Sequence, residues 1–210
     1  MKPRTLFAVV AGLGLLTSQA TAQSVLFDFD SGPVNTATPL DQVAGGITAH
    51  FSHESVYPYA IWAANVWGFT PAGFSGLCLW PATVYRSDLY IGFSTPLSDI
   101  SMLYAPQELA TDSSCTMRIT AYLGSTFVAT TTHQNQNPGT WPTDTLSIAP
   151  ASPFDNVVIH YEAPPPTGGD FGPIFTIDNV VVTPVPEPAG LAAIGIGIAY
   201  LLGLRRAKRK

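Results

Sequence analysis

Three aspartates near the two ends of the central part of the chain have a pattern that suits a calcium site. In the stretch FDFD, Asp28 and Asp30 share one face of an extended strand, while the two phenylalanines point to the other. Asp178 lies in the stretch FTIDNV, near the other end. If these stretches are neighbouring strands, their carboxylates converge, and Ca²⁺ is the hard cation that such oxygens hold. The alternative is solvated carboxylates on edge strands, where charge discourages aggregation.

Aromatic residues are dense between residues 57 and 90. Trp62, Trp67 and Trp80 are the candidates within this region for stacking on the apolar face of a sugar ring. The alternative is that most of these aromatic side chains fill the hydrophobic core, where large rings contribute most. The sequence therefore predicts a ligand-binding role for these tryptophans only where a loop exposes them.

Cys78 and Cys115 are the two cysteines of the chain. In an oxidising compartment two cysteines most simply form one disulfide, which would stabilise the fold by about 3–4 kcal/mol through loop closure. Free thiols are the alternative. A catalytic thiol is not favoured, because no histidine or basic residue stands beside either cysteine in sequence to lower its pKa.

No catalytic motif stands out in the sequence. His50 and His53, in the stretch HFSHE, match no zinc-protease spacing and fall on opposite faces of a strand, so they are expected to be surface histidines. A carboxylate pair for glycoside hydrolysis needs no motif, and Glu54, Glu108 and Glu162 leave an envelope hydrolase open as an alternative. The expectation is nevertheless a protein that is not an enzyme.

Charge is unevenly distributed along the 210 residues. The whole chain has a net charge of −5, yet residues 23–183 hold two basic and thirteen acidic residues, a net charge of −11. A surface of this sign repels phosphate backbones, so we expect no nucleic-acid partner.

The composition of residues 23–183 favours strands joined by turns. Nineteen prolines and eighteen glycines favour short strands over helices. In Thr116–Leu123 the side chains of Met117, Ile119, Ala121 and Leu123 share one face, and Gly124-Ser125 predicts a two-residue hairpin turn. The other expected strands are 25–29, 47–51, 89–93, 100–104, 126–132, 145–148, 157–161 and 175–182. This pattern predicts an all-β domain over residues 23–183, an antiparallel two-sheet β-sandwich of jelly-roll type.

Both ends of the chain have the composition of targeting segments. Residues 1–22 combine Lys2 and Arg4, an apolar run and a small-residue site at Ala20–Ala22, which is typical of a secretory signal peptide. Residues 184–210 hold a Pro-rich stalk and an uncharged stretch, Ala189–Leu204, that predicts a short transmembrane helix. A basic stop-transfer cluster closes the chain with Arg205, Arg206, Lys208, Arg209 and Lys210.

This C-terminal segment resembles the PEP-CTERM sorting signal, on the strength of Pro186, Glu187 and Pro188, then the short apolar helix, then the basic end. The resemblance covers about the last 25 residues. It implies that an exosortase recognises Pro186–Pro188 and processes the tail, in bacteria associated with exopolysaccharide and biofilm.

The body more loosely resembles carbohydrate-binding-module-like jelly rolls, through VLFDFDSG at its start and FTIDNVVVTPVPEP at its end. That resemblance implies a structural calcium near the first and last strands, and no particular ligand. The sequence therefore predicts a non-catalytic surface or extracellular-matrix protein that the Sec machinery exports. It would be held in the inner membrane with its body outside the cytoplasm, then sorted by an exosortase. The main alternative is a calcium-stabilised module that binds exopolysaccharide.

Overall fold

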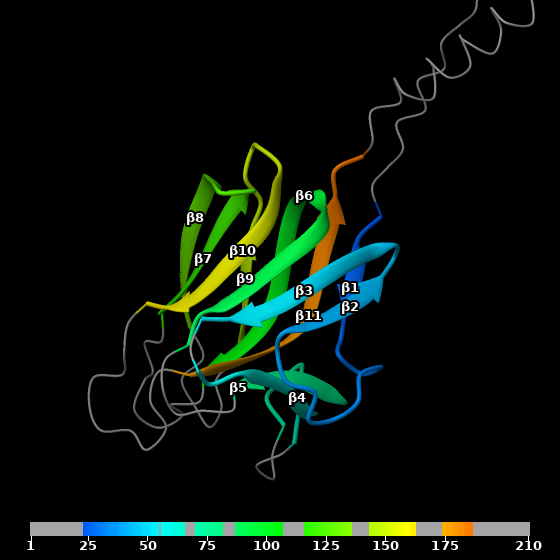
Figure 1. Ribbon diagram of the computed structural model, residues 1–210. Helices are drawn as coiled ribbons and strands as arrows, with labels where there is room; N and C mark the ends of the chain where they lie inside the picture. The colour runs from blue at the N-terminus through cyan, green and yellow to red at the C-terminus, as the bar shows by residue number, and fades with distance from the viewer. Residues whose placement is uncertain are drawn as a thin grey trace, which may run out of the picture. The chain divides into compact units, whose positions relative to one another are not determined.

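The computed structural model describes residues 23–54, 56–65, 70–81, 87–106, 116–135, 143–162 and 174–186. The described residues form eleven strands, with antiparallel pairing throughout and no helix (Figure 1). The all-β prediction is confirmed. The strands are β1 (Val25–Phe27), β2 (Leu40–Ala44), β3 (Ile47–His53), β4 (Tyr59–Ala63), β5 (Leu77–Pro81), β6 (Leu89–Pro106), β7 (Thr116–Leu123), β8 (Thr126–Gln134), β9 (Asp144–Ile148), β10 (Phe154–Tyr161) and β11 (Phe175–Pro184).

The strands form two layers that share one strand. The first layer runs β2-β3-β6-β10-β7-β8 and uses the N-terminal part of β6. The second layer uses the C-terminal part of β6, with β9 on one side and β11 on the other; β1 and β5 also pair with β11, and β4 pairs with β5. Figure 1 shows β6 running through both layers.

The prediction of two separate sheets needs a correction, because β6 joins the layers. This strand is 18 residues long and forms hydrogen-bonded pairs with β3 and β10 near its start and with β9 and β11 near its end. All eleven strands therefore belong to one hydrogen-bonded sheet that folds over on itself. The jelly-roll connectivity stays a prediction.

The core lies between the layers and follows the alternation of the strands. On β7, Met117, Ile119 and Ala121 are fully buried, as their spacing predicts. The same spacing predicts burial of Leu123, which is instead 43% exposed. The reason is local: the register of β7 with β8 shifts after Ala121, and Leu123 directly precedes the hairpin turn. Gly124 takes a positive φ of 57° in that turn, which confirms the predicted hairpin.

Residues 1–22 and 187–210 lie outside the described residues. The predicted signal peptide, the apolar stretch Ala189–Leu204 and the basic cluster therefore stay predictions. The part of the chain that the structure describes contains no helix suited to crossing a membrane.

Candidate functional site

The outer face of the first layer, which points away from the core, carries a row of residues that crosses five strands. Backbone pairing places His50 of β3 beside Gly92 of β6, Gly92 beside Asn156 of β10, and Asn156 beside Tyr122 of β7. Tyr122 in turn pairs with Phe127 of β8. Because side chains at paired positions share one face of a sheet, all five positions belong to the outer face.

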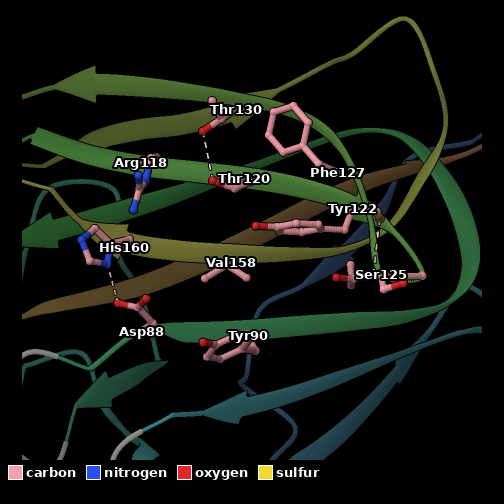
Figure 2. Close-up of a pocket in the computed structure, with 12 residues that line it drawn as sticks. Asp88, Tyr90, Arg118, Thr120, Tyr122, Ser125, Phe127, Thr130, Val158 and His160 are labelled. Atoms are coloured by element: carbon pink, nitrogen blue, oxygen red, sulfur yellow. Dashed lines mark hydrogen bonds and ion pairs between the residues drawn. The ribbon is translucent and has the colours of Figure 1, made fainter.

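Aromatic side chains line the larger of two hollows on this face. The hollow has a volume of about 580 Å³ and lies over β6, β10, β7 and β8. Tyr90 and Tyr122 lie on either side of Val158, and Phe127 lies beyond Tyr122 (Figure 2). The rings of Tyr122 and Phe127 meet edge to face, with centroids 6.2 Å apart. Phe127 is 58% exposed, so this apolar ring faces solvent rather than the core.

A second hollow continues the first toward β3 and β2. It has a volume of about 470 Å³, and Asp41, His50, Phe93 and Ser94 contribute to its walls. Gly124 and Asn156 line both hollows. The two hollows therefore form one groove across the outer face, which we call the outer-face groove.

Gly92 forms the floor of this groove near its middle. Its position lacks a side chain between Tyr90 and Ser94 on the same face of β6. A Cβ added there would meet no atom within 4 Å, and the backbone does not have a positive φ. Neither backbone geometry nor packing therefore requires glycine at this position, yet its absent side chain keeps the groove open.

Carboxylates stand along the groove and most are paired. Asp88 accepts a hydrogen bond from Nδ1 of His160 at 2.6 Å, and Nδ1 of His50 lies 2.5 Å from Asp41. Asp155 accepts hydrogen bonds from the backbone N–H of Gly124 and from the side-chain amide of its neighbour Asn156. The Asp155 contacts hold the β7–β8 turn against β10 and fix the junction of the two hollows.

The electrostatic field at the centre of the groove is negative. Partial burial raises the pKa of Tyr90, and the carboxylate of Glu54 raises it further by its charge and by the hydrogen bond that it accepts from the hydroxyl group. The charge of Asp88 acts in the same direction. Arg118, which lines the groove near His160, forms an ion pair with Glu162 at 3.1 Å.

The three aspartates predicted to bind calcium do lie near one another. Asp178 is 1% exposed and accepts hydrogen bonds from the backbone N–H groups of Ser75 and Asn179. The pKa of Asp178 is raised to about 7, mainly by burial and in part by the negative charges of Asp30 and Asp28, and the two hydrogen bonds oppose this rise.

As they stand, no three acidic, histidine or cysteine side chains in the described ranges are grouped so that they could hold a metal ion. Asp30 is instead bonded to the backbone N–H of Leu77 at 2.6 Å, and Asp28 to that of Asp30 at 3.2 Å. The calcium site stays a prediction.

Trp62 and Trp80 do not line the groove. Trp80 is 7% exposed and packs in a small second core with Phe74 and Cys78. Trp62 is 36% exposed on β4, a strand outside the first layer, and Trp67 lies outside the described residues. The aromatic-rich region predicted from the sequence includes Tyr90 but not Tyr122 or Phe127, although Tyr122 lies on the polar face of the predicted strand. The alternation of apolar and polar residues along that strand is the signal that indicates an outward-facing Tyr122.

The other predicted residues are described only in part. Cys78 is a buried free thiol, and burial raises its pKa to about 12. Cys115, its predicted partner, lies outside the described residues, and the structure holds no disulfide at Cys78. Pro186 is exposed, and Glu187, Pro188 and the basic cluster also lie outside the described part.

Comparison with known proteins gives structural likeness only. No family model matches the chain, and no curated protein matches it in sequence. The K1 cleaved adhesin domain of Lys-gingipain from Porphyromonas gingivalis W83 is 10% identical with a TM-score of 0.44, over 78% of this chain and 99% of that one. A DUF4465 family protein from Bacteroides ovatus is 5% identical with a TM-score of 0.42, over 77% and 99%. A mutant of CBM29-2, a family 29 carbohydrate-binding module, is 12% identical with a TM-score of 0.34, over 77% and 91%. These likenesses are too distant to transfer a function to this chain.

Proposed function

We propose that this protein is a non-catalytic surface or matrix protein whose β-domain binds polysaccharide in the outer-face groove. The observation that carries the proposal is the groove itself, which is open, crosses the strands and has Tyr90, Tyr122 and Phe127 along one part of its length. Aromatic rings pack against the C–H faces of sugars, and the neighbouring hydroxyl, amide and carboxylate groups bond to sugar hydroxyls.

The shape of the groove favours a chain over a single sugar. The two hollows meet at Gly124 and Asn156 and together extend from β2 to β8. A monosaccharide would fill only one hollow, whereas several consecutive sugar units would occupy both. The ligand class that fits best is therefore an extended glycan.

Removal of the Tyr122 ring is expected to weaken glycan binding. Calorimetric titration of the purified mature protein with the exopolysaccharide of its host and with neutral hexasaccharides measures the affinity. We expect Tyr122→Ala to raise Kd by about tenfold, which corresponds to about 1.4 kcal/mol. Trp62→Ala is the matched control, because it removes an exposed ring outside the groove. An unchanged Kd for Tyr122→Ala, or no heat with any glycan, would contradict the proposal.

Delivery of the domain to the cell surface is part of the same proposal. The signal peptide of residues 1–22 would direct Sec export, and an exosortase would recognise Pro186, Glu187 and Pro188 and process the tail. Mass spectrometry of the mature C-terminus, in cells with and without the exosortase, tests this. The expected result is loss of Arg205–Lys210 only where the enzyme is present. Detection of the intact tail in both strains would refute the sorting step.

A structural calcium at Asp28, Asp30 and Asp178 is also proposed. The supporting observation is the burial of Asp178 beside two further negative charges, which makes its ionisation unfavourable without a cation. The residues present fit Ca²⁺ in type, because carboxylate oxygens are its preferred ligands, but the three side chains would have to turn toward a common point to hold the ion.

A further inference from the structure

Both hollows of the outer-face groove carry carboxylates. Asp41 and Asp155 line the hollow near β3, and Asp88 lines the hollow near β7. Glu54 bonds to the Tyr90 hydroxyl group, and Glu162 is paired with the groove residue Arg118. These five carboxylates face a single permanent cation, since Arg118 is the one lysine or arginine within the described ranges.

Such a field discriminates between glycans by charge. A uronate or sulfated chain would bring like charges against Asp41, Asp88 and Asp155, which is unfavourable. A neutral chain would gain nothing from the field. A chain with protonated amines would place a cation beside the carboxylates of each hollow, which is favourable.

We infer that the glycan bound in the outer-face groove bears protonated amines, as a glucosamine polymer does. This inference rests on the proposed function, and it adds the chemical class of the ligand. Contact by the aromatic rings would hold the sugar faces, while the carboxylates of the two hollows would select for the amines. Because both hollows carry acidic residues, at least two amine-bearing units along the chain would contribute.

A pair of hexasaccharides that differ only in acetylation provides the test. Calorimetry of the purified mature protein at about pH 6, where sugar amines are protonated, compares the glucosamine hexamer with its N-acetylated form. We expect the amine form to bind at least about tenfold more tightly, and its Kd to rise as salt screens the attraction. Equal or tighter binding of the acetylated form would overturn the inference and leave the proposed function intact. Failure of both hexamers and of all neutral glycans to bind would overturn both.

Charge variants show whether the carboxylates of the groove are responsible for the tighter binding of the amine form. Asp41→Asn and Asp88→Asn each remove one carboxylate charge from a different hollow, and each should weaken binding of the amine form by about three- to tenfold. Asp99→Asn is the matched control, because it removes the same charge from the second-layer part of β6, where Asp99 bonds to Ser98 and Thr183. An equal loss in Asp99→Asn would mean that the amines respond only to the net charge of the protein, which would overturn the inference.

Discussion

Substitution of Gly92 by leucine is expected to abolish glycan binding while leaving the domain folded. Glycan binding is the proposed function, and Gly92 forms the floor of the groove that carries it. A leucine side chain at this position would rise between His50 and Asn156, the paired residues on either side, and would fill the channel that joins the two hollows. A bound chain would have to leave one hollow, so we expect Kd to rise by about a hundredfold or more.

The stability of the Gly92→Leu variant should not be lower than that of the unchanged protein. The added Cβ meets open space, and glycine in the middle of a strand is less favourable than a residue with a side chain. We therefore expect a melting temperature equal to or above that of the unchanged protein. Gly92→Ala should give a smaller loss of affinity, and Thr145→Leu, an exposed site on β9 of the other layer, should give none. Retention of full affinity by Gly92→Leu would show that glycans do not bind in the groove.

The stability of the domain should depend strongly on pH because of Asp178. The folded state raises the pKa of this carboxyl group from an ordinary 3.8 to about 7, so the folded protein holds a proton that the unfolded chain has released. The stabilisation is therefore fully present below about pH 4 and is lost as pH rises toward about 7. Over this interval the free energy of unfolding should fall by up to about 1.4 kcal/mol per pH unit, at most about 4 kcal/mol in total.

Chemical denaturation between about pH 4 and 8 measures this slope. In Asp178→Asn the ionisable group is gone, so the fall between about pH 4 and 7 should disappear. One lost backbone hydrogen bond should make this variant less stable than the unchanged protein by about 1 kcal/mol near pH 4. Above about pH 7, where the unchanged protein has lost the stabilisation from Asp178, the variant should be the more stable of the two. If the fall in stability with pH persists in Asp178→Asn, the pH dependence does not come from ionisation of Asp178.

Asp30→Asn provides a finer control on the same slope. It removes one of the two negative charges that oppose ionisation of Asp178, so the pKa of Asp178 should be lower in this variant. The fall in stability should therefore end at a lower pH than in the unchanged protein. The amide oxygen of the new side chain can still accept the hydrogen bond from the backbone N–H of Leu77, so the local structure should persist.

The response of the melting temperature to added Ca²⁺ is a second measure of the ionisation of Asp178. A cation bound by Asp28, Asp30 and Asp178 would favour the ionised carboxylate and so offset the loss of stability above neutral pH. At about pH 8, above the raised pKa of Asp178, added Ca²⁺ should raise the melting temperature of the unchanged protein and have no effect on Asp178→Asn. An absence of any calcium response at that pH would refute the calcium site, while the pH slope would still stand.

The sequence is most informative where a strand alternates regularly over its whole length. Residue spacing predicts the strand Thr116–Leu123 and the turn at Gly124, and both are confirmed as β7 and its hairpin. Where the structure has β6, the sequence predicts two strands, because Pro96 and its polar neighbours interrupt the apolar pattern. In the structure the carbonyl group of Pro96 accepts a hydrogen bond from the N–H of Val185, and the strand continues past it.

Other elements could not be predicted because their patterns depend on distant partners. The sequence does not indicate strands β2, β4 and β5, and β5 has four consecutive buried residues without alternation, since both of its faces are covered. The groove escapes prediction for a related reason. Gly92, Asn156 and Tyr122 become neighbours only through the pairing of β6, β10 and β7, which no local spacing encodes.

The pairing of β11 with β6 and β1 also has a mechanical consequence. The C-terminal end of the domain continues from β11, whose residues pair along β6 from Phe175↔Pro106 to Pro184↔Leu97 and with β1 at Val25↔Val182. A protein anchored by its C-terminal tail and pulled by a glycan in the groove would carry the load along these strands. The hydrogen bonds between them would then be sheared together rather than opened one at a time, so the domain should unfold slowly under tension.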